Sequence, residues 1–136
     1  MQELVIMADK QNLPQVLAFI DEQLEKHECP AKVMTQMDLA TEEIFANISS
    51  YAYEPDSGYA TVRVEITDEP ASVMISFIDK GTPYDPLAKP DPDLKIPVRE
   101  RRKGGLGIFL VKKSMDDMRY EYKDGQNILT IIKTIK

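Results

Sequence analysis

Three stretches of the chain carry apolar residues at every third or fourth position, the spacing that aligns them along one face of an α-helix. The first stretch begins near Pro14, because proline is tolerated in a first helical turn, and the second should fade near Pro55. The apolar positions are Leu13, Val16, Leu17, Ile20 and Leu24, then Val33, Met37, Ala40, Ile44 and Ile48, and, after Gly107, Ile108, Val111, Met115 and Met118. The pattern predicts three amphipathic helices.

Other stretches alternate apolar and polar residues, which is the pattern of a strand with one buried face. Two of them flank Asp68-Glu69-Pro70 and predict a β-hairpin. Two more flank Asp124-Gly125-Gln126-Asn127, a sequence that suits a tight turn. A short strand precedes the first helix. The predicted strands cover residues 3–8, 62–67, 73–78, 119–123 and 128–135.

Between residues 81 and 103 the periodicity disappears and prolines recur, so this segment is predicted to be a long loop. Long structureless loops are unusual in a small domain and tend to be lids or binding loops. The order of strand, two helices, hairpin, loop, helix and hairpin does not alternate strands with helices. It predicts an α+β two-layer sandwich, with a mostly antiparallel mixed sheet, helices on one face, and a pocket between the layers under the loop.

Length and composition narrow the class of protein. The 136 residues have the length of one domain and contain no internal repeat or linker, so a single domain over 1–136 is expected. Cys29 is the only cysteine, which excludes an internal disulfide. The acidic N-terminal stretch does not resemble a signal peptide, and no apolar run approaches a membrane span. A reduced, cytoplasmic protein that does not bind membranes is expected.

The charge is unevenly distributed. A net charge of −6 argues against direct nucleic-acid binding, since affinity for a phosphate backbone needs a cationic surface. Basic residues nevertheless outnumber acidic ones between Lys89 and Lys113. Such a local cationic patch suits a small polyanion such as a triphosphate. An ordinary solvated basic loop is the alternative.

Glu43 and Asn47 stand four residues apart in the second predicted helix, so their side chains share one face beside the apolar stripe. A carboxylate can act as a general base toward a hydroxyl, and an amide oxygen is a hard ligand suited to Mg²⁺. Glu42 is the rival base, but no polar residue follows it four positions on. A solvent-facing polar pair is the alternative interpretation.

Two further motifs follow the hairpin. Asp79 ends its second strand, where a carboxylate can accept a hydrogen bond from an exocyclic amine, and Gly81 allows close backbone approach. A simple strand stop and turn is the alternative. Lys103-Gly104-Gly105-Leu106-Gly107 opens the third helix, where backbone N–H groups and the helix dipole suit phosphate. A flexible hinge is the alternative there.

In this order, the motifs resemble the asparagine box and the two glycine boxes of the GHKL superfamily of ATP-binding domains. Within that superfamily they resemble the small anti-sigma regulatory factors that act as serine/threonine kinases. The matching runs are residues 41–47, 79–87 and 104–111, and the ending 120–130 follows the same pattern. The resemblance covers nearly the whole chain. It implies the Bergerat fold, as a single histidine-kinase-like ATPase domain with an ATP lid at about 82–103.

The resemblance also implies a role for each site residue. Glu43 would be the base that polarises a substrate serine hydroxyl, and Asn47 would bind the Mg²⁺ that bridges the phosphates. Asp79 would bind the adenine amino group, with Gly81 packed against the base and Thr130 supporting it through water. The backbone of Gly104, Gly105, Leu106 and Gly107 would cradle the phosphates, and Lys103, with Arg101 or Arg102, would contact them from the lid.

The implied cofactors are ATP and Mg²⁺, and the implied activity is that of a serine kinase in a partner-switching system. Its partners would be a STAS-type anti-anti-sigma protein, whose serine is phosphorylated, and a sequestered sigma factor or other regulator. Homodimers are usual in this group. A catalytically inactive ATP-binding module that acts by sequestration is the alternative. A histidine kinase is disfavoured, because no helical segment carries a phosphoacceptor histidine, and His27 lies at the end of the first predicted helix.

Overall fold

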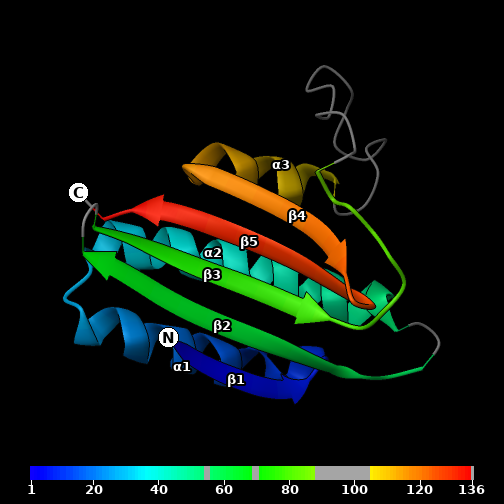
Figure 1. Cartoon of the computed structure of the whole chain (residues 1–136). Helices are drawn as coiled ribbons and strands as arrows, with labels where there is room; N and C mark the ends of the chain where they lie inside the picture. Colours follow the sequence, from blue (N-terminus) through cyan, green and yellow to red (C-terminus); the bar gives the residue numbers. More distant parts are fainter. Residues whose placement is uncertain (54–55, 69–70, 88–104, 136) are drawn as a thin grey trace.

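The described part of the chain forms a five-stranded sheet whose one face is covered by helices (Figure 1). In this computed structural model the structure describes residues 1–53, 56–68, 71–87 and 105–135. The strand order is β1-β2-β3-β5-β4, and every neighbouring pair is antiparallel. The strands are β1 (Gln2–Met7), β2 (Tyr59–Asp68), β3 (Ala71–Asp79), β4 (Asp117–Lys123) and β5 (Gln126–Thr134).

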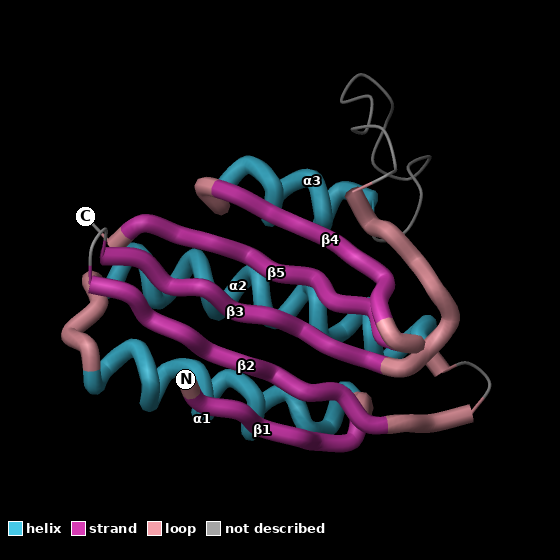
Figure 2. Tube along the Cα trace, viewed as in Figure 1, coloured by secondary structure: helices cyan, strands magenta, loops and turns pink. Residues whose placement is uncertain are grey.

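The helices form the second layer, behind the sheet in the view of Figure 2. They are α1 (Leu13–Lys26), α2 (Ala31–Asn47) and α3 (Gly105–Ser114). A 3₁₀ turn, η1 (Lys10–Asn12), leads into α1, and a π-helical turn, η2 (Ile48–Ala52), ends α2. The predicted α+β two-layer sandwich with helices on one face is confirmed. Within the described ranges, no helix has both the length and the apolar character needed to cross a membrane.

The core lies between the two layers, under the central strand β3. Val73, Ile75 and Phe77 alternate along β3 toward the helices and are almost fully buried. The helices cover them with Val16, Ile20 and Leu24 from α1 and with Met37, Ile44 and Phe45 from α2. Full burial of each such side chain stabilises the fold by about 1.5–3 kcal/mol. The end of β3, where Asp79 stands, is therefore anchored by the core.

The third helix is shorter than its apolar spacing predicts. It ends at Ser114, and Met118, expected on its buried face, lies in β4 instead. The cause is Asp116, whose N–H donates to Ile132 O at 2.9 Å and whose carboxylate accepts the N–H of Thr134 at 2.5 Å. These bonds begin the pairing with β5, and strand pairing replaces a further helical turn.

The end of α2 is fastened to the loop that follows β3. Ala52 O, in η2, accepts the N–H of Thr82 at 2.9 Å. The Tyr53 hydroxyl accepts the N–H of Lys80 at 2.7 Å and donates to Tyr59 O at 2.6 Å. Burial raises the pKa of Tyr53, so this hydroxyl keeps its proton. Single π-helical turns of this kind are frequent at functional sites, and this one fixes the loop against α2.

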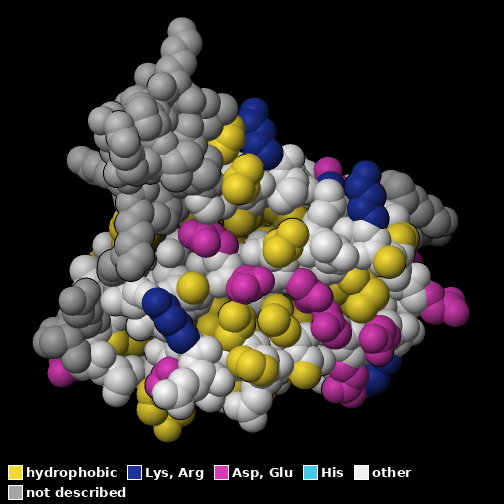
Figure 3. All heavy atoms as spheres, turned by 180° about the vertical axis from the view of Figure 1, so that it is seen from behind, with side chains coloured by type: hydrophobic (Ala, Val, Ile, Leu, Met, Phe, Trp, Pro, Cys, Tyr) yellow, Lys and Arg dark blue, Asp and Glu magenta, His cyan; other side chains and the backbone are white. Residues whose placement is uncertain are grey.

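Carboxyl groups face one another where α1 and α2 pack. Figure 3 shows acidic side chains gathered on the helix face of the molecule. Burial raises the pKa of Asp38 to about 7, and the carboxyls of Asp21 and Glu42 act in the same direction. Folded Asp38 therefore keeps a proton that the unfolded chain has lost above about pH 4. Stability consequently falls as the pH rises from about 4 to about 7.

Asp38→Asn should raise the free energy of unfolding by about 1 kcal/mol at about pH 8, because the amide removes the carboxyl repulsion. The gain is smaller than the full linkage energy because solvent screens the partly exposed Asp38. Near pH 4 the variant should match wild type, whose Asp38 is then neutral. Urea unfolding at both pH values measures the effect, with the exposed Glu25→Gln as control. A variant less stable than wild type at the higher pH would contradict it.

Candidate functional site

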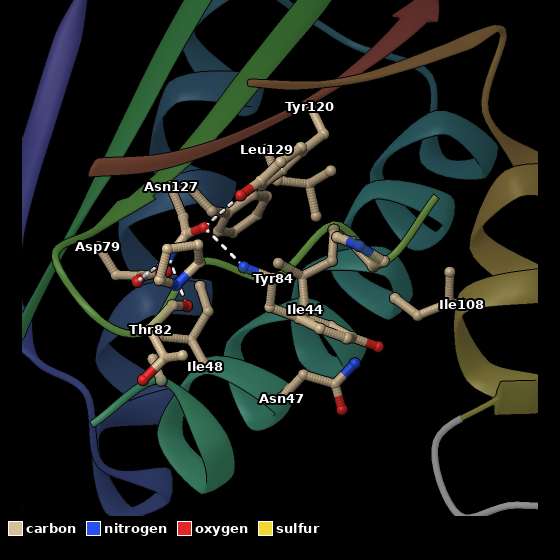
Figure 4. A pocket seen from close by; sticks show the side chains of 14 residues that line it. Ile44, Asn47, Ile48, Asp79, Thr82, Tyr84, Ile108, Tyr120, Asn127 and Leu129 are labelled. Atoms are coloured by element: carbon tan, nitrogen blue, oxygen red, sulfur yellow. Dashed lines mark hydrogen bonds between the residues drawn. The ribbon is translucent and has the colours of Figure 1, made fainter. Parts of the chain in front are cut away.

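A cavity of about 250 Å³ opens between the helix layer and the sheet, at the end where β3 finishes (Figure 4). Most of its wall is apolar, with residues such as Ile44, Phe77 and Leu129. Its polar side chains include Asn47, Asp79 and Asn127, which come from α2, β3 and β5. The pocket predicted between the layers is therefore present, and it brings Asn47 and Asp79 together.

The Asp79 carboxylate has one oxygen bound by the protein and one left for a ligand. Oδ1 accepts the N–H of Gly81 at 2.9 Å and Nδ2 of Asn127 at 3.0 Å. No residue in the described ranges donates to Oδ2. Asp79 is only 6% exposed, yet Oδ2 is not among the side-chain atoms sealed from solvent without a partner, so it is open to the pocket. An exocyclic amine entering the pocket would satisfy it.

Asn127 is the polar residue of β5 that lines the pocket, whereas Thr130 does not line it. Asp79 and Asn127 are partners across the β3–β5 ladder. Thr130 lies three positions further on, so it points to the other face of the sheet, where its hydroxyl is 3.0 Å from Ser76 Oγ. The structure thus corrects the role predicted for Thr130. The sequence signal for Asn127 is strand alternation, since it shares a face with buried Leu129.

Glu43 and Asn47 lie one turn apart on α2, in hydrogen-bonding contact. Burial raises the pKa of Glu43, the hydrogen bond from Asn47 lowers it, and the charge of Glu42 raises it further. An Asn47 amide that donates to Glu43 keeps its oxygen for a cation. Glu42 itself is exposed. Of the two candidate bases, the geometry favours Glu43.

The first turn of α3 lies against Glu43. A Cβ on Gly107 would stand 2.1 Å from Glu43 Cδ, so a side chain at this position would displace the Glu43 carboxylate from where it now lies. Gly105 and the backbone of Leu106 belong to the same turn, whose N–H groups carry the positive end of the helix dipole. The predicted contacts of Lys103 and Gly104, and the predicted lid from residue 88 on, lie outside the described residues.

Gly81 approaches the protein backbone. A Cβ on Gly81 would stand 2.1 Å from Ala52 O, the same oxygen that accepts the Thr82 N–H. Close packing at Gly81 is therefore present, but the group against it is the end of α2. The role of Gly81 in packing against a base stays a prediction.

One pocket thus brings together Asp79 at the end of β3, Asn47 on α2 and the first turn of α3, where Ile108 lies. A mostly apolar pocket with a few polar groups, between a helix layer and a sheet, has the form of a small-molecule site. Comparison with known families identifies the family. Residues 6–133 match the model described as "Histidine kinase-like ATPase domain", and the chain belongs to that family. The family predicted from the three sequence boxes is confirmed.

Curated relatives of the chain are bacterial serine kinases. The serine/threonine-protein kinase BtrW of Bordetella bronchiseptica is 28% identical over 101 residues, which is 74% of this chain and 70% of that protein. The serine-protein kinase RsbW of Bacillus mycoides is 28% identical over 100 residues, or 71% of this chain and 61% of that protein. The RsbW of Bacillus cereus is 29% identical over 97 residues, with 68% and 59% covered. The match therefore spans about three fifths of the Bacillus proteins.

Solved structures share the fold at lower identity. A crystal structure of RsbU and RsbW domains from Mycobacterium tuberculosis matches with a TM-score of 0.69 and 17% identity, over 99% of this chain and 33% of that chain. The Acinetobacter baumannii histidine kinase AdeS matches with a TM-score of 0.54 and 14% identity, over 100% of this chain and 70% of that chain. These likenesses support the two-layer architecture.

Gly81→Ala should destabilise the protein by about 2 kcal/mol or more, because the new methyl group meets the backbone oxygen of Ala52, which cannot rotate away. Urea unfolding followed by circular dichroism measures the loss. The neighbouring Lys80→Ala keeps the backbone bond to Tyr53 and should change stability by no more than about 0.5 kcal/mol. Equal stability of the two variants would show that the contact with α2 does not matter.

Proposed function

We propose that this protein is an anti-sigma regulatory factor of the serine kinase type, which binds Mg-ATP and phosphorylates a STAS-type anti-anti-sigma partner. The observation that carries the proposal is the convergence of Asn47 and Asp79 on one pocket, with Glu43 beside Asn47 on the same helix. The serine kinase names of the curated relatives support it. A cytoplasmic homodimer that sequesters a sigma factor or similar regulator is the corresponding assembly.

The sheet end of the pocket suits the adenine base. Asp79 Oδ2 is the free acceptor, and the apolar wall formed by Ile44, Ile48 and Leu129 offers the flat ring a non-polar surface. A mostly apolar pocket with few well-placed polar groups is the usual form of a small-molecule site. Base recognition therefore falls to Asp79, in agreement with its predicted role.

The α2 and α3 end of the pocket suits the phosphates. The Asn47 amide oxygen is a hard ligand, and Mg²⁺ commonly takes one or two protein oxygens together with substrate phosphates. The donor set therefore fits, and the bound ion would neutralise charge that develops on the phosphoryl oxygens. The start of α3 lies beside this end, since Ile108 lines the pocket, and the N–H groups of its first turn, with Gly104 and Lys103, are proposed to cradle the phosphates.

Glu43 is the proposed general base. Burial shifts the pKa of Glu43 upward, toward neutral pH, and a general base is more effective when its pKa lies near the operating pH. Glu43 takes the proton of the partner's serine hydroxyl as the serine oxygen bonds to the γ-phosphorus. The bond between that phosphorus and the β–γ bridging oxygen breaks, and ADP leaves. Asn47 holds the Glu43 carboxylate by its hydrogen bond.

Nucleotide binding should stabilise the wild-type protein. At about one hundred times the dissociation constant, Mg-ATP should add about 2.7 kcal/mol to the free energy of unfolding. Asp79→Asn should lose most of this gain, because its amide would set a donor against the adenine amine. Thermal unfolding with and without Mg-ATP measures both, with Asp68→Asn at the far end of the hairpin as control. Wild type unaffected by Mg-ATP would refute the proposal.

Glu43→Gln separates a kinase from a binding module. The variant should bind Mg-ATP as wild type does but transfer phosphate to a STAS-domain protein of the same genome at least about 100-fold more slowly, because its amide accepts no proton. Transfer of labelled phosphate from ATP measures the rate. The matched control is Glu42→Gln, at the exposed neighbouring position. Equal transfer rates for both variants would exclude Glu43 as the base. Absence of transfer by wild type would favour the sequestering module.

A further inference from the structure

The side-chain amide of Asn127 is fully used by hydrogen bonds inside the protein (Figure 4). Its Nδ2 donates to Asp79 Oδ1 and to Thr82 O, each at 3.0 Å. Its Oδ1 accepts the N–H of Tyr84 at 3.1 Å and the hydroxyl of Tyr120. Two amide hydrogens and two oxygen lone pairs are the whole capacity of an asparagine side chain. Asn127 therefore has nothing left to offer a ligand.

These partners permit one orientation of the Asn127 amide. The Asp79 carboxylate and Thr82 O can only accept, and the Tyr84 N–H can only donate. A reversed amide would set oxygen against oxygen on one side and N–H against N–H on the other. Burial raises the pKa of Tyr120, so its hydroxyl keeps the proton that it donates. At 6% exposure, Asn127 could not replace lost bonds with water.

We propose that Asn127 is a positioning residue that holds the Asp79 carboxylate with one oxygen toward the pocket, and thereby sets the pocket's preference for a purine with an amino group on its six-membered ring. The proposal deepens the proposed ATP-binding function and rests on it. The observation behind it is that Asn127 and Gly81 both bind Asp79 Oδ1 and leave Oδ2 to the base.

The chemistry of the base turns this orientation into specificity. A free carboxylate oxygen accepts from the exocyclic amine of adenine and repels the carbonyl oxygen that hypoxanthine carries at the same ring position. Sites with a buried polar group that the wrong ligand leaves unpaired discriminate strongly. ATP and ITP carry the same ribose and phosphates, so the ratio of their affinities reports on recognition of the six-membered ring of the base.

Asn127 also fastens the wall of the pocket. Thr82 and Tyr84, which it binds, line the cavity together with Pro83 and Pro86. A role confined to this wall would weaken ATP and ITP equally when Asn127 is removed. A role in orienting Asp79 would change the ratio of the two affinities. The ratio therefore separates positioning from general support.

Isothermal titration calorimetry of Mg-ATP and Mg-ITP on the full chain tests the proposal. Wild type should prefer ATP by about 50-fold, and Asn127→Ala should lower this preference to about 5-fold or less. Thr130→Ala, on the same strand but on the opposite face of the sheet, should keep the wild-type ratio. If Asn127→Ala does not fold by circular dichroism, Asn127→Ser takes its place and should also fall below the wild-type ratio.

A second arm uses Asp79→Asn. With Asn127 present, the amide oxygen of the new side chain should stay bound to Asn127 and Gly81, which turns its NH₂ group toward the base. The preference should then reverse in favour of ITP. In the double variant Asp79→Asn/Asn127→Ala, nothing but the Gly81 N–H holds that orientation, and the reversal should be largely lost.

Three outcomes would overturn the positioning role. The first is an unchanged ATP-to-ITP ratio in Asn127→Ala, with both affinities reduced equally. The second is a ratio near one in wild type, and the third is a reversal that survives in the double variant. Wild type that binds neither nucleotide would instead refute the proposed function itself, so the two failures are distinguishable.

Discussion

The buried carboxylate of Asp79 is the interaction on which the site depends. A charged group at 6% exposure is costly unless hydrogen bonds replace its water. The fold satisfies Oδ1 through Gly81 and Asn127 and leaves Oδ2 facing a pocket with mainly apolar walls. An acceptor that only solvent in the pocket can satisfy favours a ligand that donates, because an unmatched ligand would displace that solvent and leave the acceptor unpaired. Binding energy and selectivity thus have the same physical origin.

Neighbouring residues of helix α2 have two different roles, in the core and in the proposed chemistry. Ile44 and Phe45 are buried against the sheet, which fixes the rotation of the helix about its axis. Glu43 and Asn47 border that buried stripe, one turn apart, so the core holds them at the edge of the pocket. Gly107 then allows α3 to approach the Glu43 carboxylate. The raised pKa of Glu43 follows from this packing, since burial is its largest cause.

The sequence predicted the elements that local periodicity governs. The helix spacing of α1 and α2, the hairpin of β2 and β3 and the final hairpin are all present. The helical spacing wrongly placed Met118 in the third helix. The hydrogen bonds between Asp116 and β5 that end this helix are tertiary contacts, so they leave no local signal in the sequence. The family resemblance identified the sequence boxes in their order. It did not indicate on which face of the sheet a given strand residue lies.

Thr130 and Gly81 show this limit of the sequence. The face on which Thr130 points follows from the register of β5 against β3, in which Ser76 is its partner. The close approach of Gly81 to Ala52 of η2 joins segments far apart in the chain, so no local pattern in the sequence indicated it. Asn127 could have been found, because strand alternation places it on the buried face. Its hydrogen-bond partners follow only from the folded loop.

The two ends of the site are connected through one rigid element. At the base end, Ala52 O binds the Thr82 N–H, and Tyr53 binds Lys80. At the other end, about two and a half turns back along the same helical run, Glu43 lies against Gly107. Close-packed helices move as units and transmit small shifts along their length. The loop after β3 and the Glu43 carboxylate therefore depend for their positions on one helical run, α2 with η2. In the proposed function, this run supports both the recognition of the purine and the placement of the proton acceptor.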